Sequence, residues 1–322
     1  MNKQPDIQYS IIVPVYNRPE EIQELLASLE RQTFRKFEVI IVEDGSSILC
    51  EKVVRSFMGR LNVKYFYKEN SGPGPSRNYG MQRAGATYFI ILDSDVILPE
   101  NYLQIVTDEL AAGYVDAYGG PDAAAVNFNP IQKAINYAMT SFLTTGGIRG
   151  KGNRLEKFHP RSFNMGISKK VFNTTGGFAP MRYGEDIDLS IRIMKAGFKT
   201  ALFKKAFVYH KRRNDFISFF KQVYHSGQAR IDLFKRHPES LKALHFFPAL
   251  FFAGLVVMLI TTLYFGLNFL TVLYLIYFLL IFISASIKYQ HIKTGILSVW
   301  SSIVMLSGYG LGFLSALIKR KH

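Results

Sequence analysis

The chain has 322 residues, enough for an α/β domain of about 200 to 250 residues with an appendage and too many for a single small module. Its net charge of +15 raises the question of nucleic-acid binding, but the basic residues concentrate between Lys199 and Lys242, before an apolar tail without Asp or Glu. That arrangement favours anionic lipid headgroups, so we expect membrane lipids and no nucleic acid as partners. Cys50 is the only cysteine, which excludes an intrachain disulfide.

The first part of the chain alternates strand and helix signals. Four apolar runs predict strands, at residues 9–15, 37–42, 63–67 and 88–92. Between them, Asn17 and Pro19 fit the N-cap and first residue of one helix, and further helices are expected at 49–58 and 76–84. Residues 1–8 are polar and lack the apolar core of a secretory signal, so we expect this domain in the cytoplasm.

Polar residues collect where these strands end. The runs are apolar on both faces, which is typical of parallel strands covered by helices on both sides, and such sheets bind ligands beyond the carboxyl ends of their strands. The residues at these ends are Asn17, Glu43, Asp44, Asp93 and Asp95. Each acid alone could be a turn former or a helix cap, but their shared position favours a binding site.

Asp93 and Asp95 follow one predicted strand and are separated by a single residue, so an extended chain can direct both carboxylates to neighbouring points. Mg2+ and Mn2+ prefer oxygen ligands and are commonly shared between protein carboxylates and substrate phosphates. The pattern therefore predicts a site for Mg2+ or Mn2+ that holds a diphosphate, although such a pair also occurs by chance.

Six short motifs occur in one order within residues 9–210. They are Val13-Pro-Val-Tyr-Asn17, Glu43-Asp-Gly-Ser-Ser47, Gly72-Pro-Gly-Pro-Ser-Arg-Asn78, Leu92-Asp-Ser-Asp95, Gly176-Gly-Phe178 and Tyr183-Gly-Glu-Asp-Ile-Asp-Leu189. In this order they resemble family 2 glycosyltransferases of the GT-A fold. The resemblance implies a Rossmann-like α/β domain, with a mostly parallel sheet and helices on both faces, that binds a nucleotide-diphosphate sugar.

The same resemblance implies roles for the residues at the strand ends. The nucleotide pocket would be lined by Pro14, Tyr16, Asn17, Glu43 and Asp44. Asp44 would accept hydrogen bonds from the base or ribose, and Arg77 would face the base or diphosphate unless it is a surface cation of its helix. Asp93 would contact the sugar or ribose, and Asp95 would bind the metal. His210 would complete the metal shell, although a lone histidine at a strand end is otherwise more often structural.

The acidic pair Glu185-Asp186 opens a predicted helix. The helix dipole favours carboxylates in a first turn, and Asp188 can pair with Arg192 four residues on, so a structural role explains much of this segment. The resemblance implies instead that Glu185 contacts substrate and that Asp186 is the general base for the acceptor hydroxyl. A single in-line displacement at the anomeric carbon would then invert its configuration.

Two further segments have alternative explanations. Phe163 and Asn164 could contact the acceptor or could belong to a packed edge strand. Residues 216–231 predict an amphipathic basic helix that lies in the headgroup plane, with a core helix as the alternative. Processive members of the family that the motifs resemble carry a Gln-x-x-Arg-Trp motif in this region. Here only Gln228-Ala-Arg230 is present, which disfavours processive polymerisation.

Three uncharged apolar runs make up the tail, at residues 246–265, 269–287 and 296–318. Each is near the ~20 residues that a helix needs to cross ~30 Å of hydrocarbon, and a soluble bundle of such helices would have no polar outer surface. Three crossings would put Lys319-Arg-Lys321 on the side opposite the first domain, against the positive-inside rule. The glycine-rich run 308–312 could let the last segment re-enter or lie flat, and the sequence leaves this open.

We expect three parts: a GT-A catalytic domain over residues 1–214, an amphipathic interface region over 215–243 and a transmembrane helical region over 244–322. The expected function is an inverting hexosyltransferase that moves a sugar from a UDP-sugar to a polyprenyl-linked saccharide acceptor. It would act at the cytoplasmic face of the cell inner membrane, as a multi-pass protein, in surface or exopolysaccharide biosynthesis. The alternatives are a polyprenyl-phosphate monosaccharide synthase and, in another class, a catalytically inactive membrane scaffold.

Overall fold

The structure is a computed structural model, and it describes residues 7–123, 128–146, 160–211 and 213–319. Its contacts divide the chain into two compact units, each described here by itself. The sheet unit consists of residues 1–125 and 158–211, and the helical unit of residues 126–157 and 212–322. The expected boundaries at residues 214 and 243 remain a prediction, and the contacts add that residues 126–157 group with the C-terminal part.

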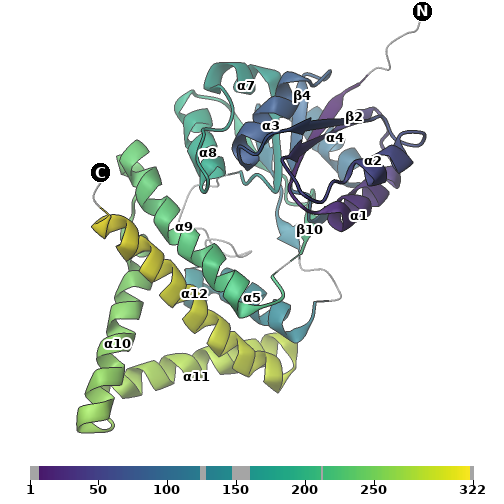
Figure 1. Ribbon diagram of the computed structural model, residues 1–322. Helices are drawn as coiled ribbons and strands as arrows, with labels where there is room; N and C mark the ends of the chain where they lie inside the picture. Colours follow the sequence, from purple (N-terminus) through teal and green to yellow (C-terminus); the bar gives the residue numbers. More distant parts are fainter. Residues whose placement is uncertain (1–6, 124–127, 147–159, 212, 320–322) are drawn as a thin grey trace, which may run out of the picture. The chain divides into compact units, whose positions relative to one another are not determined.

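A seven-stranded sheet with the order β3-β2-β1-β4-β8-β6-β9 forms the centre of the sheet unit (Figure 1). Its strands are β1 (Tyr9–Val15), β2 (Phe37–Asp44), β3 (Val63–Lys68), β4 (Tyr88–Leu92), β6 (Ala117–Gly119), β8 (Asn164–Ser168) and β9 (Thr200–Leu202). The first four pair in parallel, β6 pairs in parallel with β9, and β8 runs antiparallel to both β4 and β6. The predicted mostly parallel sheet is thereby confirmed.

Helices cover both faces of this sheet. They are α1 (Pro19–Glu30), α2 (Glu51–Phe57), α3 (Pro73–Gln82), α4 (Tyr102–Ala112), α7 (Lys169–Thr175) and α8 (Glu185–Lys195). The helix expected at residues 76–84 begins earlier, at Pro73, because proline is accepted at the first helical position, where its missing N–H is not needed. A second sheet, in the order β5-β10-β7, contains β5 (Val96–Ile97), β7 (Asp122–Ala123) and β10 (Val208–His210).

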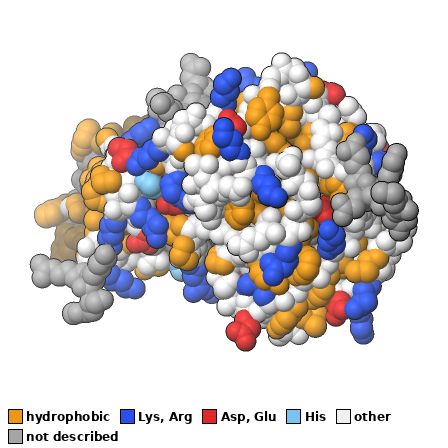
Figure 2. All heavy atoms as spheres, turned by 90° about the horizontal axis from the view of Figure 1, so that it is seen from above, with side chains coloured by type: hydrophobic (Ala, Val, Ile, Leu, Met, Phe, Trp, Pro, Cys, Tyr) orange, Lys and Arg blue, Asp and Glu red, His pale blue; other side chains and the backbone are white. Residues whose placement is uncertain are grey.

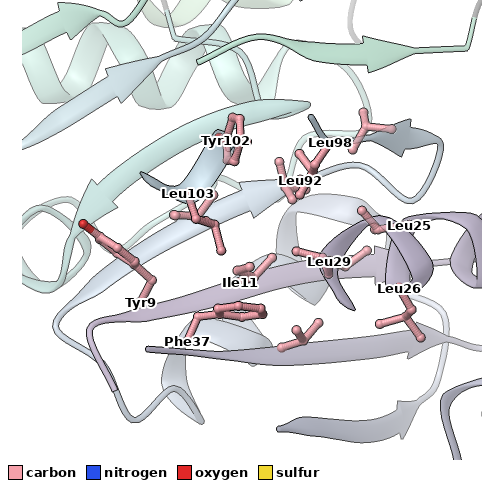
Figure 3. Packing of buried hydrophobic residues seen from close by; sticks show 14 of the residues in the cluster. Tyr9, Ile11, Leu25, Leu26, Leu29, Phe37, Leu92, Leu98, Tyr102 and Leu103 are labelled. Carbon is pink, nitrogen blue, oxygen red and sulfur yellow. The ribbon is translucent and has the colours of Figure 1, made fainter. Parts of the chain in front are cut away.

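Alternate residues of the central strands pack into two separate cores. Ile11 of β1 lies in one core with Leu25 and Leu29 of α1, as Figure 3 shows. Ile12 points to the opposite face, where it packs in a second core with Leu189 of α8. Burying a side chain of this size contributes about 1.5–3 kcal/mol, so both faces stabilise the sheet and fix the position of its edges.

On the face drawn in Figure 2, charged side chains are spread out rather than gathered in one band. Figure 2 shows one face on which Lys and Arg side chains are separated by polar, apolar and acidic ones. On this face the positive charge is therefore dispersed.

The helical unit contains the apolar tail. Its elements are α5 (Pro130–Thr140), α6 (Phe142–Thr145), α9 (Phe216–Arg236), the 3₁₀ turns Pro238–Ser240 and Ala243–Phe246, α10 (Phe247–Phe265), α11 (Phe269–Tyr289) and α12 (Ile292–Ile318). Three of its helical segments are long and apolar enough to cross a membrane: Ala243–Phe265, Phe269–Tyr289 and Ile292–Ile318. The last one is continuous, so the glycine-rich run 308–312 does not break it.

Candidate active site

The carboxyl ends of β1, β2 and β4 lie at one edge of the sheet, because the three strands are parallel. Since β8 runs the other way, its first residue, Asn164, pairs with the last residue of β4, Leu92, at the same edge. In the second sheet, His210 of β10 pairs with Val96, the residue after Asp95. The topology thus brings the expected acids and His210 together from distant parts of the sequence.

Asp93, Asp95 and His210 form a group that could hold a metal ion. Each offers one ligand atom, and these atoms lie within 4.8 Å of one another. His210 Nε2 is 3.2 Å from Asp95 Oδ1, which is buried and accepts no well-formed hydrogen bond from the described residues. Two carboxylates and an imidazole suit Mn2+ or Mg2+ when substrate phosphates supply further oxygens, so these residues fit the predicted metal.

Arg18 lies beside the same group. Its Nη1 donates a hydrogen bond to Asp95 Oδ2 at 2.6 Å. Burial by itself would raise the pKa of Asp95, but His210 and Arg18 hold that pKa well below its ordinary value. Asp95 is therefore ionised at neutral pH, which is the state that a metal ligand needs.

Arg77 is buried in the sheet unit, so the alternative of a surface cation on α3 is wrong. Its Nη2 donates to Asp93 Oδ1 at 2.7 Å and its Nη1 donates to Glu185 Oε1 at 2.9 Å. Burial alone would lower the pKa of Arg77, but the two carboxylates raise it. The guanidinium also lies over the Phe178 ring, 5.1 Å from its centroid. Arg77 therefore links the candidate metal group to the acidic pair of α8.

The acidic pair occupies the first turn of α8. Asp186 Oδ1 accepts a hydrogen bond from the Ile187 N–H at 2.8 Å, and Asp186 Oδ2 accepts one from Arg161 Nε at 2.7 Å. Burial would raise the pKa of Asp186, but Arg161 and Arg77 keep it below its ordinary value. Burial and the neighbouring Asp186 raise the pKa of Glu185 in spite of Arg77. The pKa values of the two acids are thus shifted in opposite directions, downward for Asp186 and upward for Glu185.

Further along the same helix, Asp188 and Arg192 form the predicted i,i+4 pair. Arg192 Nε donates to Asp188 Oδ2 at 2.8 Å. The Arg192 guanidinium also donates to the carbonyl of Thr175, the last residue of α7, and to that of Gly177 in the loop before α8. This pair therefore fixes the helix against the preceding loop and does not belong to the candidate site.

The last two residues of β2, Glu43 and Asp44, are expected nucleotide contacts. Asp44 accepts hydrogen bonds from Lys68 Nζ at 2.5 Å and from the N–H groups of Ser71 and Gly72 at 2.9 and 2.8 Å. Glu43 has no exposed surface and accepts hydrogen bonds within the turn, from Ser46 Oγ and from the Cys50 N–H. In this structure, Glu43 supports the turn from inside and lines no open surface.

The predicted N-cap role of Asn17 is wrong. The N-cap of α1 is Arg18, and Asn17 takes the left-handed conformation with φ 54°. Its side-chain carbonyl accepts hydrogen bonds from the N–H groups of Ser47 and Ile48, at 2.8 and 2.9 Å. These donors come from the turn after β2, so Asn17 joins two loops of the sheet edge instead of beginning a helix.

Asn164 is also internal. Its Nδ2 donates to the Ala206 carbonyl at 2.8 Å, its Oδ1 accepts from the Tyr102 hydroxyl at 2.6 Å, and its side chain has no exposed surface. The edge-strand alternative is wrong because β8 lies between β4 and β6. Asn164 therefore has no surface in this structure from which to reach an acceptor. By contrast, Tyr16 is 53% exposed and Pro14 is partly exposed, so both can meet a ligand.

Three cations at this edge were not anticipated from the sequence. Arg18, Lys68 and Arg161 each form a hydrogen bond with a carboxylate that the sequence had marked. Their spacing carries no local signal, because the partners lie 77, 24 and 25 residues away. The one available hint was chemical: a buried carboxylate requires a partner of opposite charge.

The fold and the site together define a class: an α/β domain with a group of side chains that could hold a metal ion at the carboxyl edge of its sheet. The sequence model of the glycosyl transferase family 2 matches residues 10–183, more than half of the chain. The chain therefore belongs to glycosyl transferase family 2, and the predicted GT-A fold with C-terminal membrane segments is confirmed.

Several curated relatives match a part of this chain. Poly(ribitol-phosphate) beta-N-acetylglucosaminyltransferase TarS of Staphylococcus aureus is 34% identical over 116 residues, which is 35% of this chain and 19% of TarS. Validoxylamine A glucosyltransferase of Streptomyces hygroscopicus is 35% identical over 121 residues, 36% of this chain and 27% of that protein. The alignments thus span less than a third of each relative's length.

Two solved structures share the fold. The mannosyltransferase PcManGT from Pyrobaculum calidifontis, in complex with GDP-Man and Mn2+, has a TM-score of 0.69 at 15% identity, covering 99% of this chain and 92% of that one. Staphylococcus aureus TarS 1-349 in complex with UDP-GlcNAc has a TM-score of 0.51 at 20% identity, covering 71% of this chain and 67% of that one. At these identities the likeness concerns the fold.

Proposed function

We propose that this chain is an inverting, metal-dependent hexosyltransferase that moves a sugar from a UDP-sugar to a polyprenyl-linked saccharide acceptor. It acts at the cytoplasmic face of the inner membrane, as a step in surface or exopolysaccharide biosynthesis. The observation that carries this proposal is the ion-pair chain Asp93–Arg77–Glu185, which connects the candidate metal group to the acidic pair that contains Asp186. One connected network thus offers a place for a leaving diphosphate and a base for the incoming hydroxyl.

The donor occupies the carboxyl edge of the sheet in this proposal. Tyr16, Pro14 and Asp44 contact the nucleotide, while Asn17 and Glu43 hold the two loops that carry them. A UDP-sugar is favoured because the related TarS fold has been seen with UDP-GlcNAc. Arg77 and Arg18 place positive charge near the diphosphate, although both are engaged with carboxylates in this structure.

Asp95 and His210, with Asp93 turned toward the sugar or ribose, would hold Mg2+ or Mn2+. When bound, such an ion offsets the charge that develops on the leaving diphosphate. The residues of the chain prepare this site in advance, because the depressed pKa of Asp95 keeps its carboxylate ionised.

Asp186 takes the proton of the acceptor hydroxyl. The hydroxyl oxygen then forms a bond to the anomeric carbon from the side opposite the diphosphate, and the bond between that carbon and the diphosphate oxygen breaks. The bonding electron pair leaves with the nucleoside diphosphate, and the anomeric configuration inverts. Asp186 Oδ2 must first exchange Arg161 for the hydroxyl, which is feasible because the Arg161 side chain is 36% exposed.

The acceptor side of the proposal follows from the helical unit. Three helices suited to a membrane favour an acceptor that is itself anchored in the bilayer. The basic residues between Lys199 and Lys242 add attraction to anionic lipids, at about 1 kcal/mol per residue near the surface. A polyprenyl-linked saccharide would present its reacting hydroxyl at this surface.

The test is release of UDP from a panel of UDP-sugars by the full chain in detergent, with and without Mn2+, and with a membrane lipid extract as acceptor source. Asp186→Asn should lower turnover by about 10² to 10⁴, the usual size of a general-base contribution. Asp95→Ala should remove the dependence on Mn2+. Asp108→Asn changes an exposed carboxylate of α4 and should leave activity unchanged.

The outcomes separate the candidate functions. Metal-dependent release from one donor, lost in both site variants, supports the proposal. Release from GDP-mannose alone would exclude the UDP-sugar while keeping the mechanism. Absence of turnover with UDP-, GDP- and TDP-sugars, together with full cellular function of both site variants, would overturn the enzyme in favour of a scaffold.

A further inference from the structure

The third apolar helix differs from the other two in its surroundings. In its most apolar 18 residues, 44% are buried, compared with 22% for the segment containing α10 and 17% for α11. Most of its buried residues are small, and the others are Met305, Leu306 and Phe313. The small ones are Thr294, Gly295, Ser298, Ser301, Ser302, Gly308, Gly310 and Gly312. A face of this kind suits close contact with other helices rather than with lipid chains.

Gly308 and Gly312 of that face pack directly on α9. A Cβ added at Gly312 would lie 1.9 Å from the Tyr224 carbonyl oxygen, and one added at Gly227 would lie 2.2 Å from the Tyr309 carbonyl oxygen. The two backbones therefore touch at their glycines. The Tyr224 hydroxyl also donates to Ser315 Oγ at 3.0 Å.

The two helices run side by side in the same direction (Figure 1). Val223 of α9 meets Gly308 of α12, and Gln228, further along α9, meets Ser315, further along α12. They consequently share one orientation, so that whatever depth α12 reaches in a membrane, α9 reaches as well.

α9 is too charged to share a membrane crossing. Lys221 lies two residues before Val223 and is exposed, and Arg230, Asp232, Lys235 and Arg236 follow. If α12 crossed the bilayer, the contact between Val223 and Gly308 would lie near its centre, because Gly308 is close to the middle of α12. A charged side chain there costs about 2.5–3.5 kcal/mol on insertion scales, so Lys221 alone opposes this arrangement.

α10 and α11 have no charged side chain near their centres. They form two sides of a triangle whose third side is α12, and they meet at the turn of Gly266 (Figure 1). The start of α10 contacts α12 at Gly310, and the end of α11 contacts it at Gly295. The apolar side chains around the turn are 76% to 82% exposed: Leu263, Tyr264, Phe265, Leu267 and Phe269. An apolar tip suits insertion into hydrocarbon, with α12 lying across the open ends.

The basic residues fit the same arrangement. Lys288 and Lys293 flank the turn before α12, and Lys319 follows its last residue, with Arg320 and Lys321 beyond the described residues. Both ends of α12 are therefore basic, and the positive-inside rule places both on one side. Trp300, 53% exposed, lies on the outer face of α12 and is of the type enriched at membrane interfaces.

We infer that α12 does not cross the membrane: α10 and α11 insert as a hairpin, and α12 lies beside α9 at the boundary between headgroups and acyl chains. The partner of this surface is the bilayer itself. Residues before α10 and after α12 then lie on the same side, which removes the conflict that three crossings create with Lys319-Arg-Lys321. The inference does not depend on the proposed activity, because topology is measured without substrate.

The test is labelling of single added cysteines by a membrane-impermeant maleimide in spheroplasts and in inside-out vesicles. Lys293→Cys marks the side reached after two crossings, Leu267→Cys marks the hairpin tip, and His322→Cys decides between two crossings and three. Wild type is the background control, because Cys50 is fully buried and burial raises the pKa of its thiol. We expect His322→Cys to be labelled from the same side as Lys293→Cys; labelling from the opposite side would overturn the inference.

A second measurement uses the only tryptophan, Trp300. Fluorescence quenching by lipids brominated at different depths reports how deep it lies. The double variant Trp300→Phe, Leu317→Trp moves the probe toward the other end of α12, to a residue that is 52% exposed. A helix parallel to the membrane gives depths that differ by no more than its own diameter, about 10 Å, whereas a crossing helix separates the two positions by about 25 Å. A depth that changes strongly between them would contradict the inference.

Discussion

The edge of the sheet in the sheet unit and the contact between α9 and α12 in the helical unit are held together by different interactions. At the sheet edge, buried charges are paired, as Arg77 is with Asp93 and Glu185. Between α9 and α12, the backbones touch at glycines such as Gly312. The sheet edge should therefore lose stability when a charge loses its partner, whereas the contact between α9 and α12 should lose stability when atoms are added.

The largest expected effect tests the charged region. Arg77→Met removes the partner shared by two carboxylates, of which Glu185 is buried and Asp93 has a side chain that is 31% exposed. Breaking a buried ion pair typically costs about 3–5 kcal/mol. We expect the sheet unit to unfold at a temperature lower by on the order of 10 °C. The measurement is thermal unfolding of the purified full chain, followed by circular dichroism.

Arg83→Met is the matched control, because Arg83 belongs to the end of the same helix but is exposed and stacks over the Tyr79 ring. Its effect should stay within about 0.5 kcal/mol. Equal losses in the two variants would mean that the bridge between Asp93 and Glu185 contributes nothing particular to the sheet edge.

The next largest effect tests the close packing between α9 and α12. Gly312→Ala places a methyl group against the Tyr224 carbonyl, and overpacking of this kind costs about 1–3 kcal/mol. The fluorescence of Trp300, which lies in α12, should report an earlier loss of this helix, while the proposed nucleotide-sugar binding by the sheet unit persists. Gly59→Ala is the control, because its added Cβ meets no atom within 4 Å. Unchanged fluorescence unfolding would show that α12 does not need close contact with α9.

The smallest expected effect concerns the pH dependence of activity and tests the paired charges at the sheet edge again. In the proposed mechanism Asp186 works as a base only when ionised, so activity should fall as pH drops through its pKa, which Arg161 helps to depress. Arg161→Gln should raise that pKa and move the acidic limb of the kcat/KM profile to higher pH. We expect a loss of about tenfold at the acidic end and little change at the alkaline end.

Arg182→Gln provides the control for this profile, since Arg182 is an exposed cation just before the acidic pair and lies over the Tyr183 ring. Its profile should match that of wild type. An Arg161→Gln profile that falls equally at every pH would indicate that Arg161 acts on substrate and not through Asp186.

Much of the candidate site could be predicted because it depends on local patterns. Asp93 and Asp95 follow an apolar run. Because runs that are apolar on both faces predict parallel strands, the place of these residues at the sheet edge could be predicted. The Asp188–Arg192 pair could be predicted for a similar reason, since residues four apart on a helix are neighbours. Asn17 was misplaced because its side chain satisfies N–H groups of another loop, which a local N-cap pattern cannot reveal.

The sequence by itself determined the family motifs, the alternation of strands and helices, and the three apolar segments, because each depends on residue type and short spacing. Only the tertiary structure decided which cation meets which carboxylate, that Asn164 is interior, and that α12 lies along α9. Arg77 and Glu185 are separated by 108 residues, and Tyr224 and Ser315 by 91. Contacts at such separations exist only once the chain has folded, and no periodicity in the sequence encodes them.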